Sequence, residues 1–293
     1  MRLSHNRAVG LMVFITFMWA TAGVVSRHLD AARSFEVTFW RATFTALALL
    51  VILPLIRGRR VFSDIRHANA GFWISSVCWS VMFTAYMVAL TLTSVANVLV
   101  TMSLGPLMTA LIARVFIGHR IPMRTWIAIV VAGLGIAYMY GSQFASGELL
   151  GTLVALCVPI AGATNWTTTQ NAHAKGHTVD LVPSVFVGAV ISGLATLPLA
   201  WPFQATAHDM GLLAYLGVFQ LAVPCVLSVM CARVLKAPEL SLLALLEVLF
   251  GILLVWVGAG EAPGATVLLG GTLVMGALVA NELLGWKQRN MQL

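Results

Sequence analysis

Apolar runs of about twenty residues, repeated along the whole chain, constrain its fold more than any other feature. A helix of this length crosses the roughly 30 Å hydrocarbon core of a bilayer. Lipid offers no partners to backbone N–H and C=O groups, so each run must be helical. A transmembrane β-barrel would instead show segments of about ten residues with alternating apolar and polar side chains. The sequence therefore predicts an all-α membrane protein.

Composition excludes a soluble fold. Hydrophobic residues make up 60% of the 293 residues and charged residues 9%, whereas a soluble domain carries roughly 25% charged residues. The net charge of +7 is then better explained by topology signals and contacts with anionic lipid headgroups than by nucleic acid. We expect the lipid bilayer and a small-molecule substrate as partners, and no nucleic acid.

Ten helices with short connections account for the apolar runs. The expected ranges are 8–26, 35–56, 71–92, 95–117 and 124–140, followed by 149–172, 181–199, 211–235, 240–257 and 265–284. The first run continues to Val25, beyond the cleavage-like Ala20-Thr21-Ala22. We therefore expect an uncleaved first helix rather than a signal peptide.

Lysines and arginines are divided unequally between the two sides that ten helices define. The side that holds both termini carries fourteen of the 17, and the other side carries only Arg27 and Arg33, with Arg41 inside the second helix. Loops on the cytoplasmic side of a membrane carry the excess of Lys and Arg. We therefore predict that both termini are cytoplasmic and that the protein lies in a bacterial inner membrane.

The two halves of the chain share a pattern of helix, short loop, proline and helix when they are aligned with a shift of 141 residues. The matched pairs are Ala96 and Ala237, Leu99 and Leu240, Leu104 and Leu245, Pro122 and Pro263, and Gly135 and Gly276. Five helices per half is an odd number, which inverts the second half relative to the first. We predict two inverted five-helix repeats, residues 1–143 and 144–293, around a central cavity, an architecture common among secondary transporters.

Three prolines fall near the centres of predicted helices: Pro106 in the fourth, Pro159 in the sixth and Pro224 in the eighth. Proline removes a backbone hydrogen bond and kinks a helix. Kinks at one depth can open a cavity and act as hinges for alternating access, although static curvature for packing is the other interpretation. We favour hinges.

Polar and aromatic residues inside the apolar runs are candidates for binding a substrate. The sixth helix has the most polar segment, 165–171, and Asn97 and Thr101 share a face of the fourth helix. Aromatic and methionine side chains can stack on a flat solute or adapt to it, but packing between helices would also explain them. The predicted substrate-binding residues are Trp19, Met82, Tyr86, Asn97, Thr101, Met102, Asn165, Trp166 and Thr169.

Two ionisable residues lie inside predicted helices, where charge is costly and marks function by default. Glu247 lies near the middle of the ninth helix. It is either a proton or charge site that faces a substrate ammonium, or a hydrogen-bonded clip to a neighbouring helix. Arg41 lies near the outer interface, where an arginine can snorkel to the headgroups, and we favour that structural interpretation.

Features of other protein classes are missing from the sequence. His173 and His177 are four residues apart, but Lys175 and Gly176 lie between them in a predicted loop, so we expect no metal site. A phosphate-binding Gly-rich loop is absent, and with it any sign of ATP-driven transport or an ATPase partner. Acid, base or metal clusters typical of a membrane enzyme are also absent. We predict a non-enzyme without a cofactor.

Several short motifs, in this order and spacing, carry a family resemblance. They are Trp19-Ala20-Thr21-Ala22-Gly23, Phe39-Trp40-Arg41-Ala42, Tyr86-Met87-Val88-Ala89-Leu90, Ser94-Val95-Ala96, Gly105-Pro106-Leu107, Leu246-Glu247-Val248, Gly260-Glu261-Ala262-Pro263 and Gly270-Gly271. Together they resemble EamA-type members of the drug/metabolite transporter superfamily. Within it, the chain is similar to bacterial exporters of aromatic amino acids.

The resemblance implies ten helices in two inverted repeats around a cavity, and outward transport of metabolites or drugs. We expect a secondary transporter that exports aromatic and other bulky neutral amino acids. The inverted repeat is compatible with a monomer that acts alone, and a dimer stays open as the alternative. A broad drug exporter of the same fold is the alternative, and a membrane enzyme or channel is less favoured. The family's Gly-Glu after the fourth helix is missing, because Gly118 is followed by His119 and Arg120, and the glutamate occurs only as Glu261.

Overall fold

The computed structural model consists of helices and connecting segments. It describes residues 4–290 except positions 33, 59–60, 67, 119–120, 144–148, 175–180, 232–233, 236–239 and 241–242. Within these residues there is no strand. In the described part of the chain, eight helices are long and apolar enough to cross a membrane, and two shorter apolar helices, Met123–Met139 and Leu246–Ala259, accompany them. The helical membrane fold is confirmed, and the count of ten spans stays a prediction.

The helix bounds follow the predicted ranges closely at most positions. The first half contains α1 (His5–Ser26), α2 (Ser34–Arg57), α3 (Val61–Arg66), α4 (Ala70–Leu92), α5 (Val95–Met102), α6 (Gly105–Ile117) and α7 (Met123–Gln143). The second half contains α8 (Leu149–Ala174), α9 (Leu181–Ala200), α10 (Ala207–Tyr215), the π-helix η1 (Leu216–Ala222), α11 (Val223–Cys231), α13 (Leu246–Ala259) and α14 (Ala265–Asn290). Large apolar side chains such as Leu55 and Val257 stay exposed, as suits helices that face lipid.

The fourth predicted helix is broken rather than continuous. The α-helical pattern stops after Met102 and starts again at Gly105, with Pro106 in the first turn of the new helix. Proline lacks the N–H that would continue the ladder and clashes with the carbonyl four residues earlier. Leu104 closes the gap with a tighter bond, from its N–H to the carbonyl of Thr101 at 3.3 Å. Leu245 precedes α13 in the same way, as a turn residue between helical segments.

The eighth predicted helix begins at Ala207 instead of Gly211 and contains a π-helix. Thr206 and Asp209 form a capping box that fixes its start. From Leu216 to Ala222 the backbone is π-helical, and the N–H of Val223 bonds to the carbonyl of Val218, five residues back. Pro224 follows directly, so the wider turn lies where the proline interrupts the α-helical ladder.

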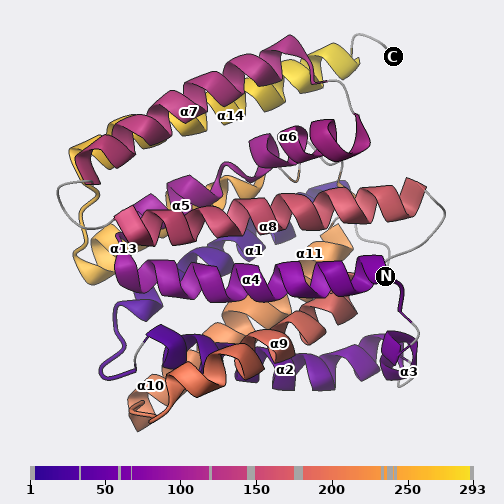
Figure 1. Ribbon diagram of the computed structural model, residues 1–293, viewed down its shortest axis with the longest axis vertical. Coiled ribbons are helices and arrows are strands. Elements are labelled where there is room, and N and C mark those ends of the chain that lie inside the picture. Colours follow the sequence, from indigo (N-terminus) through magenta and orange to yellow (C-terminus); the bar gives the residue numbers. More distant parts are fainter. Residues whose placement is uncertain are drawn as a thin grey trace.

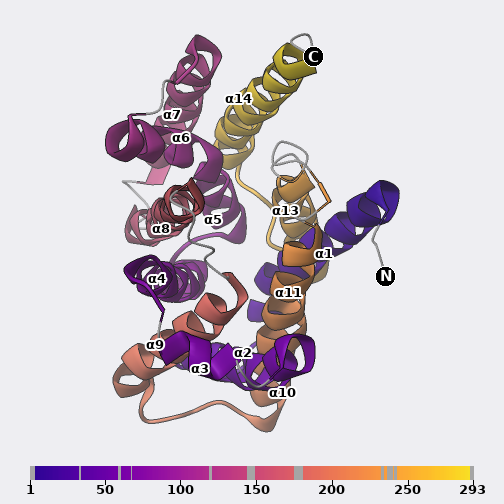
Figure 2. The same cartoon turned by 90° about the vertical axis from the view of Figure 1, so that its right-hand side faces the viewer.

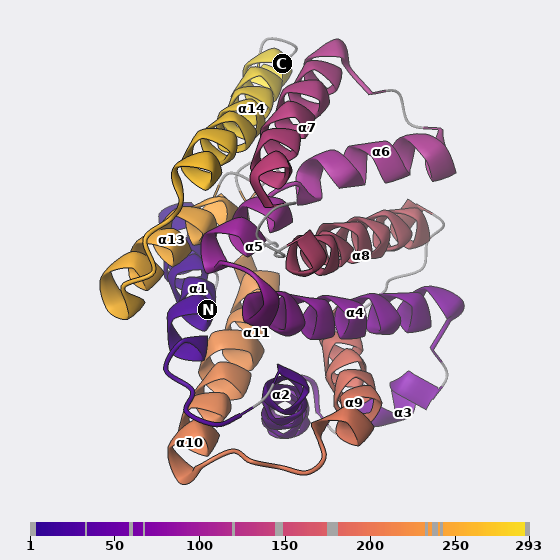
Figure 3. The ribbon, with the colours of Figure 1, turned by 60° about the vertical axis from the view of Figure 1, so that its left-hand side comes forward.

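Helices that are distant in sequence pack side by side. Figure 1 shows α7 and α14 together at one edge, and both chain ends at the same end of the long helices. Figure 2, turned by 90°, shows α4 and α8 on one side and α1, α11 and α13 on the other. The helices α2 and α9 lie across one end of this arrangement, and Figure 3 shows α2 between α10 and α9.

Glycines bring some helices unusually close. A Cβ atom added to Gly135 of α7 would lie 2.7 Å from the carbonyl oxygen of Gly270 in α14. On another pair, a Cβ on Gly217 would lie 2.5 Å from Cβ of Phe44 and 2.8 Å from the carbonyl oxygen of Arg41. Lipid provides no hydrophobic driving force between helices, so close backbone packing of this kind holds membrane helices together.

Candidate functional site

Arg41 of α2 is buried inside the bundle, which corrects the expectation that it snorkels to the interface. Its side chain is 3% exposed. The guanidinium carbon lies 5.6 Å from the ring centre of Tyr86 and 5.9 Å from that of Phe83, both on α4. Such distances suit cation–π attraction. A buried arginine held by aromatic rings is a strong marker of a functional site in a membrane protein.

Gln220 holds Arg41 in place from the π-helix. Its Oε1 accepts a 2.9 Å hydrogen bond from Nη2 of Arg41, and its Nε2 donates a 3.1 Å bond to the backbone oxygen of Trp19. Gln220 therefore connects α2, η1 and α1. Nε of Arg41 is buried without a hydrogen-bond partner among the described residues, so part of the donor capacity of the guanidinium is unused there.

Glu247 lies in the first turn of α13 and is half-buried. The exposed residues Leu249, Leu253 and Trp256 lie on the opposite side of this helix, as the helical period places them. Glu247 lies within electrostatic range of Arg41 and Tyr86, yet it forms no hydrogen bond or ion pair with them. The structure thus brings the two predicted intramembrane charges together without joining them.

Two aromatic side chains predicted to bind substrate lie on helices around this cluster. Tyr86 is buried, and Met82 is one turn before it on the same face of α4. Gly162 of α8 approaches Met82, with 3.7 Å between the sulfur and an added Cβ. Trp166 is one turn beyond Gly162 on that face of α8 and is 48% exposed.

The remaining predicted residues fall into other surroundings. Trp19 is half-buried against the apolar cluster of Met12 and Ile15, and Met102 packs against the main core. Asn165 is buried on α8. Thr169 belongs to α8, but its side chain lies outside the described residues.

Asn97 and Thr101 form part of a separate polar cluster between α5 and α8. Nδ2 of Asn97 donates to Oγ1 of Thr93 and to Oγ1 of Thr152, and Thr101 donates to the backbone oxygen of Asn97. Oδ1 of Asn97 is buried without a hydrogen-bond partner in the part of the chain that the structure describes. These side chains join two helices, which is a structural use of residues we predict to bind substrate.

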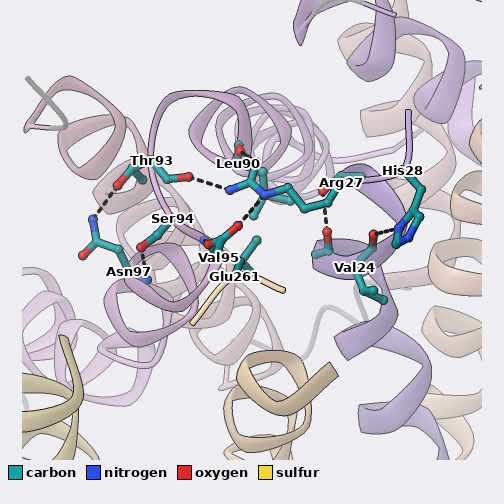
Figure 4. A network of polar contacts seen from close by, with 11 residues as sticks. Val24, Arg27, His28, Leu90, Thr93, Ser94, Val95, Asn97 and Glu261 are labelled. Carbon is teal, nitrogen blue, oxygen red and sulfur yellow. Dashed lines mark hydrogen bonds and ion pairs between the residues drawn. The ribbon is translucent and has the colours of Figure 1, made fainter. Parts of the chain in front are cut away.

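An ion pair joins the two halves of the chain at the helix ends that carry Arg27. Nε of Arg27 lies 2.6 Å from Oε2 of Glu261, and its other nitrogens donate to the backbone oxygens of Leu90 and Thr93 at 2.6 and 3.0 Å. Oε1 of Glu261 accepts from the N–H of Val95 at 2.8 Å. Figure 4 shows Arg27 between these groups. The ends of α1 and α4, the start of α5 and the loop before α14 are tied together here.

Two buried carboxylates fasten the loops at this same end. Oδ1 and Oδ2 of Asp209 accept four backbone N–H bonds, from Asp30, Ala31, Ala32 and Thr206, at 2.7–3.2 Å. Glu36 accepts from the N–H groups of Gln204 and Ala205 at 2.8–3.0 Å. The loop after α1 and the loop before α10 therefore hold each other.

Asp30, His208 and Asp209 could also be considered as metal ligands, because their ligand atoms lie within 4.8 Å of one another. The Asp209 oxygens, however, already accept four backbone N–H bonds. Asp30 and His208 are exposed and bond to each other at 3.0 Å. Loop capping accounts for this group. Of the two histidines considered as metal ligands, His173 belongs to the last turn of α8 rather than to the predicted loop, and His177 lies outside the described residues.

Sequence reasoning missed Gln220, Glu36 and Asp209 as important residues. Asp209 had a usable signal, because Thr206 followed three residues later by an acidic residue is typical of a capping box. Gln220 had a weaker one, its position four residues before Pro224 in an apolar run. The pairing of Gln220 with Arg41 depends on how distant helices pack, which no local pattern reveals.

Comparisons with known proteins point to one class. Residues 6–141 match the EamA-like transporter family. The chain is 22% identical over 277 residues to the pseudopaline exporter CntI of Pseudomonas aeruginosa, covering 92% of this chain and 94% of that protein. It is 25% identical over 135 residues to an uncharacterized transporter of Vibrio cholerae, covering 45% and 44% of the two chains. A solved crystal structure superposes with a TM-score of 0.62 at 17% identity, covering 96% of this chain and 99% of that one.

Proposed function

We propose that the chain is an EamA-type membrane transporter that exports small organic solutes, with aromatic and other bulky neutral amino acids as its preferred substrates. The matched family and the relatives with named functions are transporters, and the chain is a transporter rather than an enzyme. The name of the Pseudomonas aeruginosa relative describes an exporter, which supports the outward direction.

The cluster of the buried Arg41, Gln220 and Tyr86 with the half-buried Glu247 is the observation that carries the proposal. Its members come from α2, η1, α4 and α13, so both halves of the chain contribute. Charged groups at this depth are costly and are retained where a transport pathway needs them. One cation and one carboxylate leave the site without net charge, which suits a neutral solute with polar ends. The rings of Tyr86 and Phe83 add an aromatic wall.

In this proposal the chain works by alternating access, and helix contacts that recur between its two predicted repeats support it. We match each predicted span with the one five further along the chain. The contact of α4 with α8 then corresponds to that of α11 with α1, and the contact of α2 with η1 corresponds to that of α9 with α4. The helices that begin after Leu104 and Leu245 also end alike, at Gly118 and Gly260 with φ of 72° and 68°. Pseudo-symmetry of this kind lets one site face either side in turn.

The access states differ, in this proposal, at the Arg27–Glu261 ion pair. The predicted topology places the pair at the end away from the cytoplasm, where we propose that it keeps the site closed on that side. The break before Pro106 and the π-helix before Pro224 give these two helices bending points in this proposal. Pro159 lies inside the unbroken α8, which makes it the weakest of the three proposed hinges.

A broad drug exporter remains the second candidate, because the half-buried Glu247 beside aromatic rings also suits a flat organic cation. Transport in proteoliposomes separates the two. Proteoliposomes that contain the purified protein are loaded with unlabelled tryptophan, phenylalanine or threonine. They should accumulate the same amino acid in labelled form by saturable exchange. Inhibition by aromatic cations without exchange of any amino acid would favour the drug exporter. Flux that neither saturates nor exchanges would contradict both carriers.

A further inference from the structure

We propose that Arg41 and Glu247 recognise the two ends of a zwitterion, with Arg41 and Gln220 taking its carboxylate and Glu247 its ammonium. This inference rests on the proposed function and names the chemical feature that its substrates share. It explains why the two charged side chains lie near each other in the bundle and still do not form an ion pair.

The Arg41 end of the site is prepared for a carboxylate. A guanidinium has five N–H donors in a planar fork that matches a carboxylate with two parallel bonds. In the described residues one of these donors bonds to Gln220, and Nε has no partner. The ring centres of Phe83 and Tyr86 lie 5.9 and 5.6 Å from the guanidinium carbon, and the rings favour a cation at this position. Gln220 is fixed in turn by its bond to the backbone of Trp19.

The Glu247 end is prepared for a cation. Its carboxylate projects from the side of α13 that faces away from the exposed Leu249 and Leu253. It makes no hydrogen bond to any described residue, although Arg41, Tyr86 and Cys225 are all within electrostatic range. Glu247 is half-buried, and a carboxylate that is partly removed from water without hydrogen bonds is costly. An ammonium group bound there would supply both the charge and the donors.

The arrangement selects against solutes with a single charge. An anion bound at Arg41 would be repelled by Glu247, and a cation at Glu247 would be repelled by Arg41. A solute without charge would leave Nε of Arg41 and the carboxylate of Glu247 without partners. A zwitterion alone satisfies both. Because Arg41 lies in the first half of the chain and Glu247 in the second, such a solute also connects the two halves.

Analogues with one charge removed test the inference in the wild-type protein. Exchange of labelled tryptophan is measured in proteoliposomes against unlabelled tryptophan, tryptamine, which lacks the carboxylate, and indole-3-propionate, which lacks the ammonium. We expect the inhibition constant of each analogue to be at least about tenfold higher than that of tryptophan. Inhibition by either analogue as strong as that by tryptophan overturns the inference, without needing any variant to fold.

Three variants assign the ends. The Glu247→Gln variant loses the partner of the ammonium. The ratio between the inhibition constants of indole-3-propionate and tryptophan should therefore shrink by about tenfold, whereas the ratio between tryptamine and tryptophan should not. In Arg41→Gln the pattern should reverse. Arg41→Lys keeps the charge but loses the fork, and should bind tryptophan more weakly without gaining tryptamine. Equal weakening of all three compounds in each variant would show that the residues act only on structure, and would overturn the inference.

Failure of the proposed function gives a different result. If no amino acid is exchanged but another solute is transported, the proposed substrates are wrong, and the same test is applied to that solute. The inference stands if the transported solute carries both charges and loses inhibition when either is removed. It is overturned if the solute carries one charge or none.

Discussion

Nε of Arg27 lies 2.6 Å from Oε2 of Glu261, and this contact joins residues that are 234 positions apart. Both side chains are about one-quarter exposed, so solvent screens part of their attraction. The pair still differs from an ordinary surface ion pair. Each partner also binds backbone groups of the segment from Leu90 to Val95, and the helix ends therefore separate only when all of these bonds break.

Glu261→Gln should therefore open this end of the protein more often. We expect a cysteine at position 96, introduced by Ala96→Cys after replacement of the native cysteines, to react about fivefold faster with an impermeant thiol reagent from outside. This factor corresponds to about 1 kcal/mol, the scale of a partly exposed ion pair. Asp30→Asn is the matched control, because it removes the exposed pair with His208 nearby. Equal rates in both variants would contradict a closing role.

Glu247→Gln tests whether a proton takes part in the transport cycle. The carboxyl group is half-buried beside Arg41 and Tyr86 and makes no hydrogen bond to a described residue. A bound proton could therefore leave and return without breaking a hydrogen bond. We expect transport by the wild type to accelerate with an imposed pH gradient and transport by the variant to ignore it. The measurement is substrate efflux from proteoliposomes at several internal pH values. Identical pH responses in the two proteins would exclude the proton role.

Pro224→Ala should weaken substrate binding through Gln220. The restored N–H lets the π-helix return to α-helical geometry, which rotates Gln220 by about 100° away from Arg41. We expect the apparent affinity to fall about as far as in Gln220→Ala, and the double variant to add little more. Pro198→Ala in the regular α9 is the control. Additive losses in the double variant would show that Pro224 acts elsewhere.

Gly135→Val should destabilise the packing of α7 on α14. Overpacking typically costs about 1–3 kcal/mol, and here the added Cβ meets the backbone of Gly270 at 2.7 Å, which cannot turn aside. Gly133→Val is the matched control on the same helix, because nothing lies within 4 Å of its added Cβ. Thermal unfolding in detergent should show a lower Tm for the first variant only.

Asp209→Asn should loosen the loops after α1 and before α10. An amide keeps one acceptor oxygen and turns a donor toward N–H groups that need acceptors, at a cost of about 1–3 kcal/mol. Asp30→Asn is again the control, since Asp30 is exposed. We expect a lower Tm and faster proteolysis near residues 201–206 in the first variant alone. Equal behaviour of the two proteins would mean that the four backbone bonds contribute little.

The sequence predicted what depends on local pattern. Runs of apolar residues located the spans to within a few residues, because lipid demands a helix wherever it meets the backbone. The break before Pro106 and the π-helix before Pro224 appeared only as prolines, since a missing N–H can be accommodated in several ways. From the sequence, Arg41 was predicted to reach the outer membrane interface, because it lies only about two turns from the start of its helix. Its burial arises from Gln220, Phe83 and Tyr86, which distant helices supply.

The contact between Gly135 and Gly270 also bears on how the protein is made. Helices emerge in chain order during synthesis, so α7 enters the membrane long before α14 exists. Until then the glycine face of α7, with the finally buried Met139, must meet lipid or an insertion factor. The pair of α7 and α14 is therefore the last part of the bundle to assemble. A defect there would delay maturation while Arg41, Gln220 and Glu247, which lie on other helices, already stand in place.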